Sequence, residues 1–441
     1  MNQDKLSTSF EGKPRKGSHS KVELEVEGDK TKQHDHDVPI RDKNTNKQQT
    51  TTNILDFPDE ILFCIFKNVD PNDLNNLRLC CTKFARLAAD KFLWSFDYRK
   101  TPILPSQMEP YETFLKPLTY SLAIRGDFKH SYRNILLPNF FLKLRQICRR
   151  LRKLIIEQNY IVITKDTSTT LEKLEFKNCI VAGGTFGGVK LFPSPFFPGI
   201  CRFVPYIKHL IFNNVLWDME SPFLTSICTL TELQKLEIIS CFRIKYFYPD
   251  IDLFTTPCNC QKLEILNFQN TVVEDKIVEW FYQIESLKEL YLECPEYLRK
   301  ELSNESLKEL QNFYYEEYMP MCLFDEELHT FLCKIEPLLA QNRGEEIIAC
   351  RDNLFPNYLL SNISRYISRC TNLKILHIRH YSHVTRADIN IMALTLPNLV
   401  ELDITGCTVT LEDVKYFELQ RPNVETYSSF SKPHKRYAKN V

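Results

Sequence analysis

A recurring apolar pattern, Leu-x-x-Leu-x-Leu-x-x-Asn/Cys, constrains the fold of most of this chain. Spacings between neighbouring copies include 24, 26 and 30 residues. The three apolar positions predict a short strand, and the segments 274–284, 327–339, 358–370 and 386–394 predict return helices. Because one period cannot bury its own apolar face, the periods must stack into a continuous core. Copies start at Leu151, Leu171, Ile207, Leu233, Leu263, Leu287, Leu373 and Leu399.

This period is typical of leucine-rich repeats. It predicts an α/β solenoid with a parallel sheet on the concave face and helices outside. The Asn or Cys at the ninth position is expected to turn inward, where Asn can hydrogen-bond the backbone of neighbouring coils. Strand residues that alternate with the core positions should point onto the concave face.

The concave face is the predicted substrate-binding surface. Exposed aliphatic side chains beside aromatic ones are common at interface centres. The alternative is a merely solvated sheet. The predicted substrate-binding residues are Ile211, Ile265, Tyr291, Ile375 and His377.

Two stretches interrupt the repeats. Residues 181–205 predict a loop insertion, and its aromatic part, Phe192–Phe197, is the next candidate for a partner contact. Residues 293–345 predict one degenerate coil around Leu307 and Leu310 together with a helix. The run from Ile348 to Asn353 predicts a further coil with its Asn in place.

Residues 53–98 follow a different pattern, which predicts three short helices. Pro58 suits a first helical turn, and apolar residues from Ile61 onward recur at offsets of three and four. Asp70 can cap a second helix that Pro71 begins. The run is too short for a large core and too apolar for a surface, so we expect it to dock on a partner.

This run resembles the F-box motif. The matching positions include Phe57-Pro58-Asp59-Glu60, Ile65-Phe66, Asp73-Leu74, Leu79-Cys80 and Leu93-Trp94. It departs from the usual motif at Phe57, where Leu is commoner, and at Phe84, where Trp is commoner. A small helical cap on the solenoid would explain the apolar spacing, but not these placements together.

An F-box followed by leucine-rich repeats is similar to the substrate receptors of SCF cullin–RING ubiquitin ligases. The resemblance implies that the F-box binds a Skp-family adaptor, that the repeats bind a protein substrate, and that the chain is not an enzyme. The alternative is a non-catalytic scaffold that binds the adaptor, or another partner, without directing ubiquitination. The predicted adaptor-binding residues are Pro58, Ile61, Leu62, Ile65, Phe66, Leu74, Leu77, Leu93 and Trp94.

These patterns divide the chain into five parts. We expect a disordered N-terminal tail over 1–52, which is rich in polar and charged residues, and the F-box over 53–98. A bridge over 99–150 should cap the leucine-rich repeats of 151–428, and residues 429–441 form a basic C-terminal tail.

Composition excludes several functions. The 56 basic and 56 acidic residues give no case for nucleic acid or an anionic membrane as a partner. No apolar run approaches the ~18 residues of a membrane helix. The N-terminus has no apolar signal sequence, and many cysteines fall at apolar repeat positions, so a reducing cytoplasmic or nuclear location is expected.

No catalytic motif, metal site or cofactor is predicted. The His34–Asp37 and Cys258–Cys260 clusters lack the further ligands that a metal site needs.

Overall fold

The computed structural model describes part of the chain. Expectations for the tails 1–52 and 432–441, for His34–Asp37, for Cys258 and for residues 191–195 lie outside this part. The described residues from Phe57 onward belong to one compact unit, and the described part of the preceding unit contains the short 3-10 helix η1, Ile54–Asp56. The described residues are 53–100, 115–126, 135–136, 138–161, 169–181, 185–186, 189–190, 196–217, 226–241, 243–244, 259–273, 275–281, 283–299, 303–312, 315, 326–341, 343–354 and 362–431.

Three helices follow η1, as predicted: α1 (Asp59–Phe66), α2 (Pro71–Cys80) and α3 (Thr82–Leu87). The Asp70 carboxylate accepts bonds from the Asn72 and Asp73 amides at 2.7 and 3.1 Å, so the predicted cap is confirmed. The indole N–H of Trp94 donates to the Ala88 carbonyl at 2.7 Å. The small core of this module consists of Leu62, Phe66, Leu74, Phe84, Ala88, Leu93 and Trp94.

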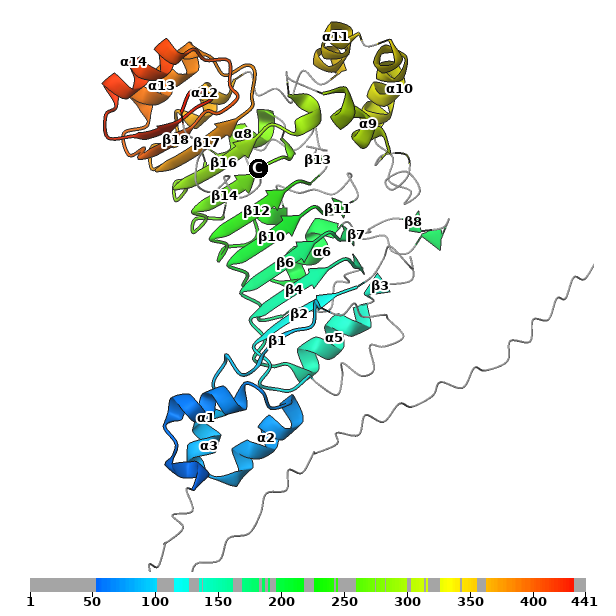
Figure 1. The fold of residues 1–441 in the computed structure, drawn as a ribbon, viewed down its shortest axis with the longest axis vertical. Coiled ribbons are helices and arrows are strands. Elements are labelled where there is room, and N and C mark those ends of the chain that lie inside the picture. Colours follow the sequence, from blue (N-terminus) through cyan, green and yellow to red (C-terminus); the bar gives the residue numbers. More distant parts are fainter. Residues whose placement is uncertain are drawn as a thin grey trace, which may run out of the picture. The chain divides into compact units, whose positions relative to one another are not determined.

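A parallel sheet of 11 strands dominates the described part of the chain (Figure 1). The order of its strands across the sheet follows their order along the chain. From one edge to the other they are β1 (Ser95–Asp97), β2 (Ser121–Arg125), β4 (Lys153–Glu157), β6 (Lys173–Lys177), β10 (His209–Asn213), β12 (Lys235–Ile239), β14 (Ile265–Phe268), β16 (Glu289–Glu293), β17 (Ile375–Arg379), β18 (Glu401–Asp403) and β19 (Glu425–Tyr427).

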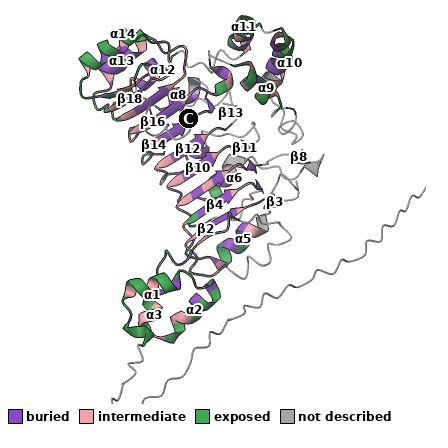
Figure 2. Cartoon of the chain, in the orientation of Figure 1, coloured by how far each residue is buried: buried purple, intermediate pink, exposed green. Residues whose placement is uncertain are grey.

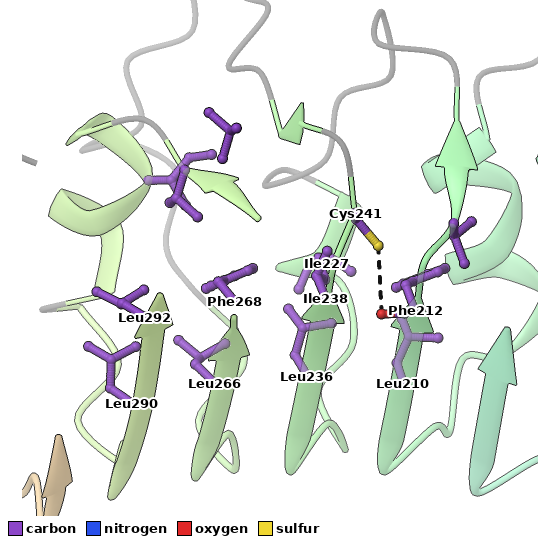
Figure 3. Packing of buried hydrophobic residues seen from close by; sticks show 14 of the residues in the cluster. Leu210, Phe212, Ile227, Leu236, Ile238, Cys241, Leu266, Phe268, Leu290 and Leu292 are labelled. Atoms are coloured by element: carbon purple, nitrogen blue, oxygen red, sulfur yellow. Dashed lines mark hydrogen bonds between the residues drawn. The ribbon is translucent and has the colours of Figure 1, made fainter. Parts of the chain in front are cut away.

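The predicted repeat register is confirmed. Leu210 aligns with Leu236, which aligns with Leu266, and Leu376 aligns with Leu402 in the next coil. All five leucines are fully buried. Figure 3 shows the leucines of neighbouring strands stacked toward one side of the sheet. The predicted α/β solenoid is therefore the fold of this region.

Return elements lie on the core side of the sheet and differ along the chain. Among the early coils, short strands β3 (Ile135–Leu136), β5 (Tyr160–Ile161), β7 (Ile180–Val181) and β11 (Leu216–Trp217) form a second parallel sheet. Strands β13 (Arg243–Ile244) and β15 (Val272–Val273) pair separately. The helices are α5 (Pro138–Ile147), α6 (Phe196–Phe203), α8 (Asp275–Phe281), α12 (Ile363–Ile367), α13 (Arg386–Thr395) and α14 (Leu411–Gln420).

The predicted loop insertion at 181–205 contains regular structure in its described part. Strands β8 (Thr185–Phe186) and β9 (Val189–Lys190) form an antiparallel pair, and helix α6 follows. The candidate contact Phe192–Phe197 falls mostly outside the described residues.

Two predicted coils between 293 and 372 are wrong. Residues there form the helices η3 (Glu296–Leu298), α9 (Asn304–Asn312), α10 (Glu326–Ala340) and α11 (Gly344–Leu354), while β16 pairs directly with β17. Leu307 and Leu310 lie on α9, and the run from Ile348 to Asn353 lies on α11. Apolar residues three apart suit a helix as well as a repeat strand, which explains the error.

The inward turn of the ninth repeat position is confirmed. The Thr271 hydroxyl donates at 2.8 Å to the carbonyl of Ile238 in the preceding coil. The Cys179 thiol donates to the Ile156 carbonyl at 3.2 Å, and the Cys241 thiol reaches the Phe212 carbonyl at 3.7 Å (Figure 3). These buried donors satisfy carbonyl groups at the strand ends and tie these three coils to the ones before them. The Asn159 amide, in contrast, donates to the Glu157 carbonyl of its own coil at 2.8 Å.

The residue just before this position adopts a left-handed backbone conformation in six coils. Asn, which tolerates this conformation, holds three of the places. The Asn214 amide also donates to the Asn178 side chain at 3.0 Å. The six residues, with φ between 50 and 62°, are Gln158, Asn178, Asn214, Ser240, Asn270 and His380.

Candidate adaptor-binding and substrate-binding surfaces

The outer face of α1 presents apolar side chains to solvent. Ile61 and Ile65 are 47 and 40% exposed and lie four residues apart, an interval that places side chains on one face of a helix. Phe57, two residues before the helix begins, is 38% exposed. Pro58, just before the helix, is exposed as well. Figure 2 shows the exposed faces of α1 and its neighbours in green.

The nine predicted adaptor-binding residues divide into two groups. Pro58, Ile61 and Ile65 lie on the surface, and Leu77 is half-buried. The others form the F-box core, so they support a contact surface without reaching a partner themselves. These are Leu62, Phe66, Leu74, Leu93 and Trp94.

Sequence reasoning left further exposed apolar side chains out of the candidate site. Among them are Phe57, just before α1, Leu79, near the end of α2 and 84% exposed, and Phe92, 66% exposed. Phe57 and Leu79 match positions of the F-box motif, yet neither lies on the helical spacing of the core. An apolar residue off that spacing is expected to face solvent, and this signal could have identified both.

Ionic contacts fix the start of α1 against α3. The Asp59 carboxylate lies 2.5 Å from the Arg86 guanidinium and 3.7 Å from the Lys83 ammonium. Lys83 also donates to the Phe57 carbonyl at 2.8 Å. These contacts hold the apolar face of α1 in place from its polar end.

The F-box joins the sheet without a break in pairing. The Tyr120 amide donates to the Trp94 carbonyl at 2.9 Å, and β1 pairs in parallel with β2. Phe96 packs against the cores of both the F-box and the solenoid. Phe96 therefore connects the helical module that carries α1 to the sheet.

We call the sheet face turned away from the core the open face; it corresponds to the predicted concave face. The five predicted substrate-binding residues lie on it, but the expectation that they protrude is wrong. Ile265 and Ile375 are half-buried, Ile211 is 9% exposed, and Tyr291 and His377 are almost fully buried. Side chains in register on parallel strands about 4.8 Å apart cover one another.

Polar contacts organise the C-terminal part of the open face. The Tyr291 hydroxyl donates to Glu289 at 2.7 Å, and its ring lies edge-on to His377 with centroids 4.7 Å apart. The His377 Nε2 atom lies 2.6 Å from the Glu401 carboxylate. Arg379 bridges the next row, 3.4 Å from Glu293 and 3.6 Å from Asp403. The arrangement is a packed polar surface in which Tyr291, His377 and Asp403 are themselves buried.

Among the described residues, no cluster of reactive side chains resembles a catalytic site. Burial raises the pKa of the thiols of Cys179, Cys241 and Cys407 to about 12, which leaves them unreactive near neutral pH. Within the described ranges, no group of three His, Cys, Asp or Glu side chains is placed to hold a metal ion. In the same ranges, the helices are too short or too polar to cross a membrane.

Comparison with known families identifies residues 54–96 as an F-box domain. The chain is thus an F-box domain followed by a leucine-rich-repeat-like solenoid. F-box domains bind Skp1-type adaptors. No curated protein matches the chain.

Several solved structures are similar to this chain at low identity and with TM-scores below 0.5. An internalin from Listeria monocytogenes is 10% identical, with a TM-score of 0.37, covering 82% of this chain and 90% of its own. A leucine-rich repeat protein from Leptospira interrogans is 16% identical, with a TM-score of 0.29 and 76% of each chain covered. A chain of the yeast Rad7–Elc1 complex is 12% identical, with a TM-score of 0.31, covering 83% of this chain and 92% of its own.

Proposed function

We propose that this protein is the substrate-recognition subunit of an SCF-type E3 ubiquitin ligase. The F-box binds a Skp-family adaptor through the exposed apolar face of α1, and the repeats bind a protein substrate on the open face. The observation that carries the proposal is an F-box domain, with that face uncovered, joined by strand pairing to a long parallel sheet. Exposed apolar rows of this kind mark protein contact sites.

In this role the chain performs no covalent step. The adaptor links it to a cullin–RING assembly, and the substrate on the open face is held near the transferred ubiquitin at a raised effective concentration. The shared packing of Phe96 between the two cores supports a fixed relation between adaptor and substrate. The apolar face of α1 and the open face both suit a protein as partner.

The proposal extends to location. The cysteines in the described part are free thiols, many of them buried in the repeats. Free buried thiols suit the reducing conditions of the cytoplasm and nucleus, where this ligase class would act.

The test uses the exposed residues of α1, because changing the buried Leu62 and Phe66 would unfold the module. In the variant Ile61→Asp with Ile65→Asp, charge replaces the outer apolar face while the core is kept. We expect co-purification of the adaptor to be lost and the circular dichroism spectrum to be unchanged. The matched control is Leu394→Asp with Leu419→Asp, since both leucines are 81% exposed on α13 and α14. Undiminished adaptor binding by the α1 variant would reject the assignment.

A second candidate function is a scaffold that binds the adaptor without directing ubiquitination. The F-box surface suits it equally well, since adaptor binding is common to both. Co-purification of the cullin with the wild-type chain distinguishes them: the receptor retains adaptor and cullin, and the scaffold retains the adaptor alone.

A further inference from the structure

The open face changes charge from one end of the sheet to the other. We follow the row formed by the first side chain of each strand from β4 to β19, and call it the first row; the strands before it, β1 and β2, contribute the uncharged Ser95 and Ser121 at this level. The first row starts with basic and imidazole groups, passes Ile265, and ends in carboxylates interrupted by Ile375. In register, the first row reads Lys153, Lys173, His209, Lys235, Ile265, Glu289, Ile375, Glu401 and Glu425.

Lysines dominate what the N-terminal half of the first row presents to solvent. Lys173 pairs with Glu175 at 3.0 Å and Lys235 with Glu237 at 3.2 Å, but each lysine side chain is more exposed than its glutamate, 29 against 19% and 31 against 15%. Lys153 is exposed. A partner approaching β4–β12 therefore meets ammonium groups first.

Positive charge in this half also acts on its histidine. The pKa of His209 is lowered from its ordinary value, first by burial and then by the charges of Lys235 and Lys173. The imidazole is thus neutral near pH 7, and the lysines set the local potential.

Carboxylates dominate the C-terminal half. On β16–β19 the open face carries Glu289, Glu293, Glu401, Asp403 and Glu425 against Arg379, and Arg299 pairs with Glu293 from outside these strands at 2.7 Å. Tyr291 donates to Glu289 and Tyr427 to Glu425, so hydroxyl groups orient these carboxylates without neutralising them. This half carries excess negative charge in a fixed arrangement.

We propose that the open face binds a protein segment with an acidic end, an apolar middle and a basic end. The acidic end lies over β4–β12, the apolar middle over Ile265 on β14, and the basic end over β16–β19, where Ile375 offers its aliphatic part a contact. The inference rests on the proposed function, whose substrate class it names. The centres of the two halves are about five strand spacings apart, roughly 24 Å. Complementary charge of this kind orients a partner and excludes wrong ones.

The first experiment needs no variant. Two labelled peptides of the same composition are compared by fluorescence anisotropy on the full-length chain at low salt. The block peptide has an acidic block and a basic block about 24 Å apart across an apolar linker, and the alternating peptide mixes the charges. We expect the block peptide to bind at least about tenfold more tightly, with the preference shrinking as salt screens the charges. Equal affinities overturn the inference.

Charge swaps then test the polarity. Lys153→Glu with Lys173→Glu makes both halves acidic and should weaken block-peptide binding by about tenfold. Adding Glu289→Lys and Glu425→Lys reverses the sign of the net charge of each half of the first row but leaves Glu293, Glu401 and Asp403 in place, so the peptide should recover part of the lost affinity, at least about threefold, in the opposite direction. The control Lys308→Glu with Lys415→Glu makes the same net change at exposed sites on α9 and α14 and should have no effect. Failure of the variant with all four changes to recover affinity also overturns the inference.

Adaptor binding, measured on the same wild-type preparation, separates the two proposals. Adaptor binding without a peptide preference rejects the bipolar segment and leaves the receptor role standing. A peptide preference without adaptor binding rejects the receptor role and leaves the charge-matched surface standing.

Discussion

The F-box core and the solenoid core bury similar side chains but differ in how completely their apolar faces are covered. The F-box core has seven buried residues, whereas the solenoid core runs through the coils from Leu115 to Val424. A small unit has too much surface for its volume. The outer face of α1 therefore stays uncovered, while each solenoid strand is covered by the next coil. The exposed apolar residues of the F-box follow from its size and leave it in need of a partner.

The largest expected effect comes from the small core. Phe66→Ala removes a side chain that packs edge-on against Phe84, with ring centroids 5.2 Å apart. The loss should destabilise the F-box by about 3–5 kcal/mol, enough to unfold it locally. Hydrogen exchange should show residues 58–94 opening while the strands after β4 stay protected. Equal loss of protection in both regions would mean that the two cores are not separable.

The solenoid core should respond over a wider region. Leu402→Ala creates a cavity beside the aligned Leu376 and should cost about 2–5 kcal/mol. Because each coil supports its neighbours, hydrogen exchange should increase in β17 and β19 as well as in β18. Urea unfolding measures the size of the effect, and the exposed Leu419→Ala is the control. A change confined to β18 would contradict coupling between coils.

The side-chain hydrogen bonds between coils can be removed with almost no change in the shape of the side chain. Thr271→Val removes the hydroxyl that donates to the Ile238 carbonyl and accepts from the Cys241 amide at 3.1 Å. Leaving these buried groups unsatisfied should cost about 1–3 kcal/mol in urea unfolding. The control Thr395→Val lies on the outer side of α13, where its hydroxyl bond to Ile391 is exposed. Equal stability of the two variants would show that the inward hydroxyl is dispensable.

The smallest effect should appear in acid. The Asp73 and Asn72 amides donate to Asp70 and lower the pKa of its carboxyl. A lowered folded-state pKa makes the cap stabilising above the ordinary Asp pKa, and this contribution is lost as pH falls through the folded value. As pH falls below about 4, near the ordinary Asp pKa, the F-box of wild type should lose more stability than that of Asp70→Asn, which keeps a capping oxygen. Parallel acid profiles for the two chains would contradict a charged cap.

Local patterns in the sequence were sufficient for the repeat register and for the F-box helices. Leu376 and Leu402 were predicted to align because apolar alternation and the period both depend on residues close in sequence. The cap at Asp70 needs only the two residues that follow Pro71. The same local rules identified Pro58, Ile61 and Ile65 without showing that the neighbouring Leu62 and Phe66 face inward.

Tertiary structure alone decided the rest. Residues 304–312 and 344–354 carry spacings that suit either a helix or a repeat strand, and only the direct pairing of β16 with β17 excludes strands there. That pairing also brings Tyr291 beside His377 and buries both. The sequence places them on alternate, outward positions, but burial depends on which strands are neighbours, and that is settled by packing between distant parts of the chain.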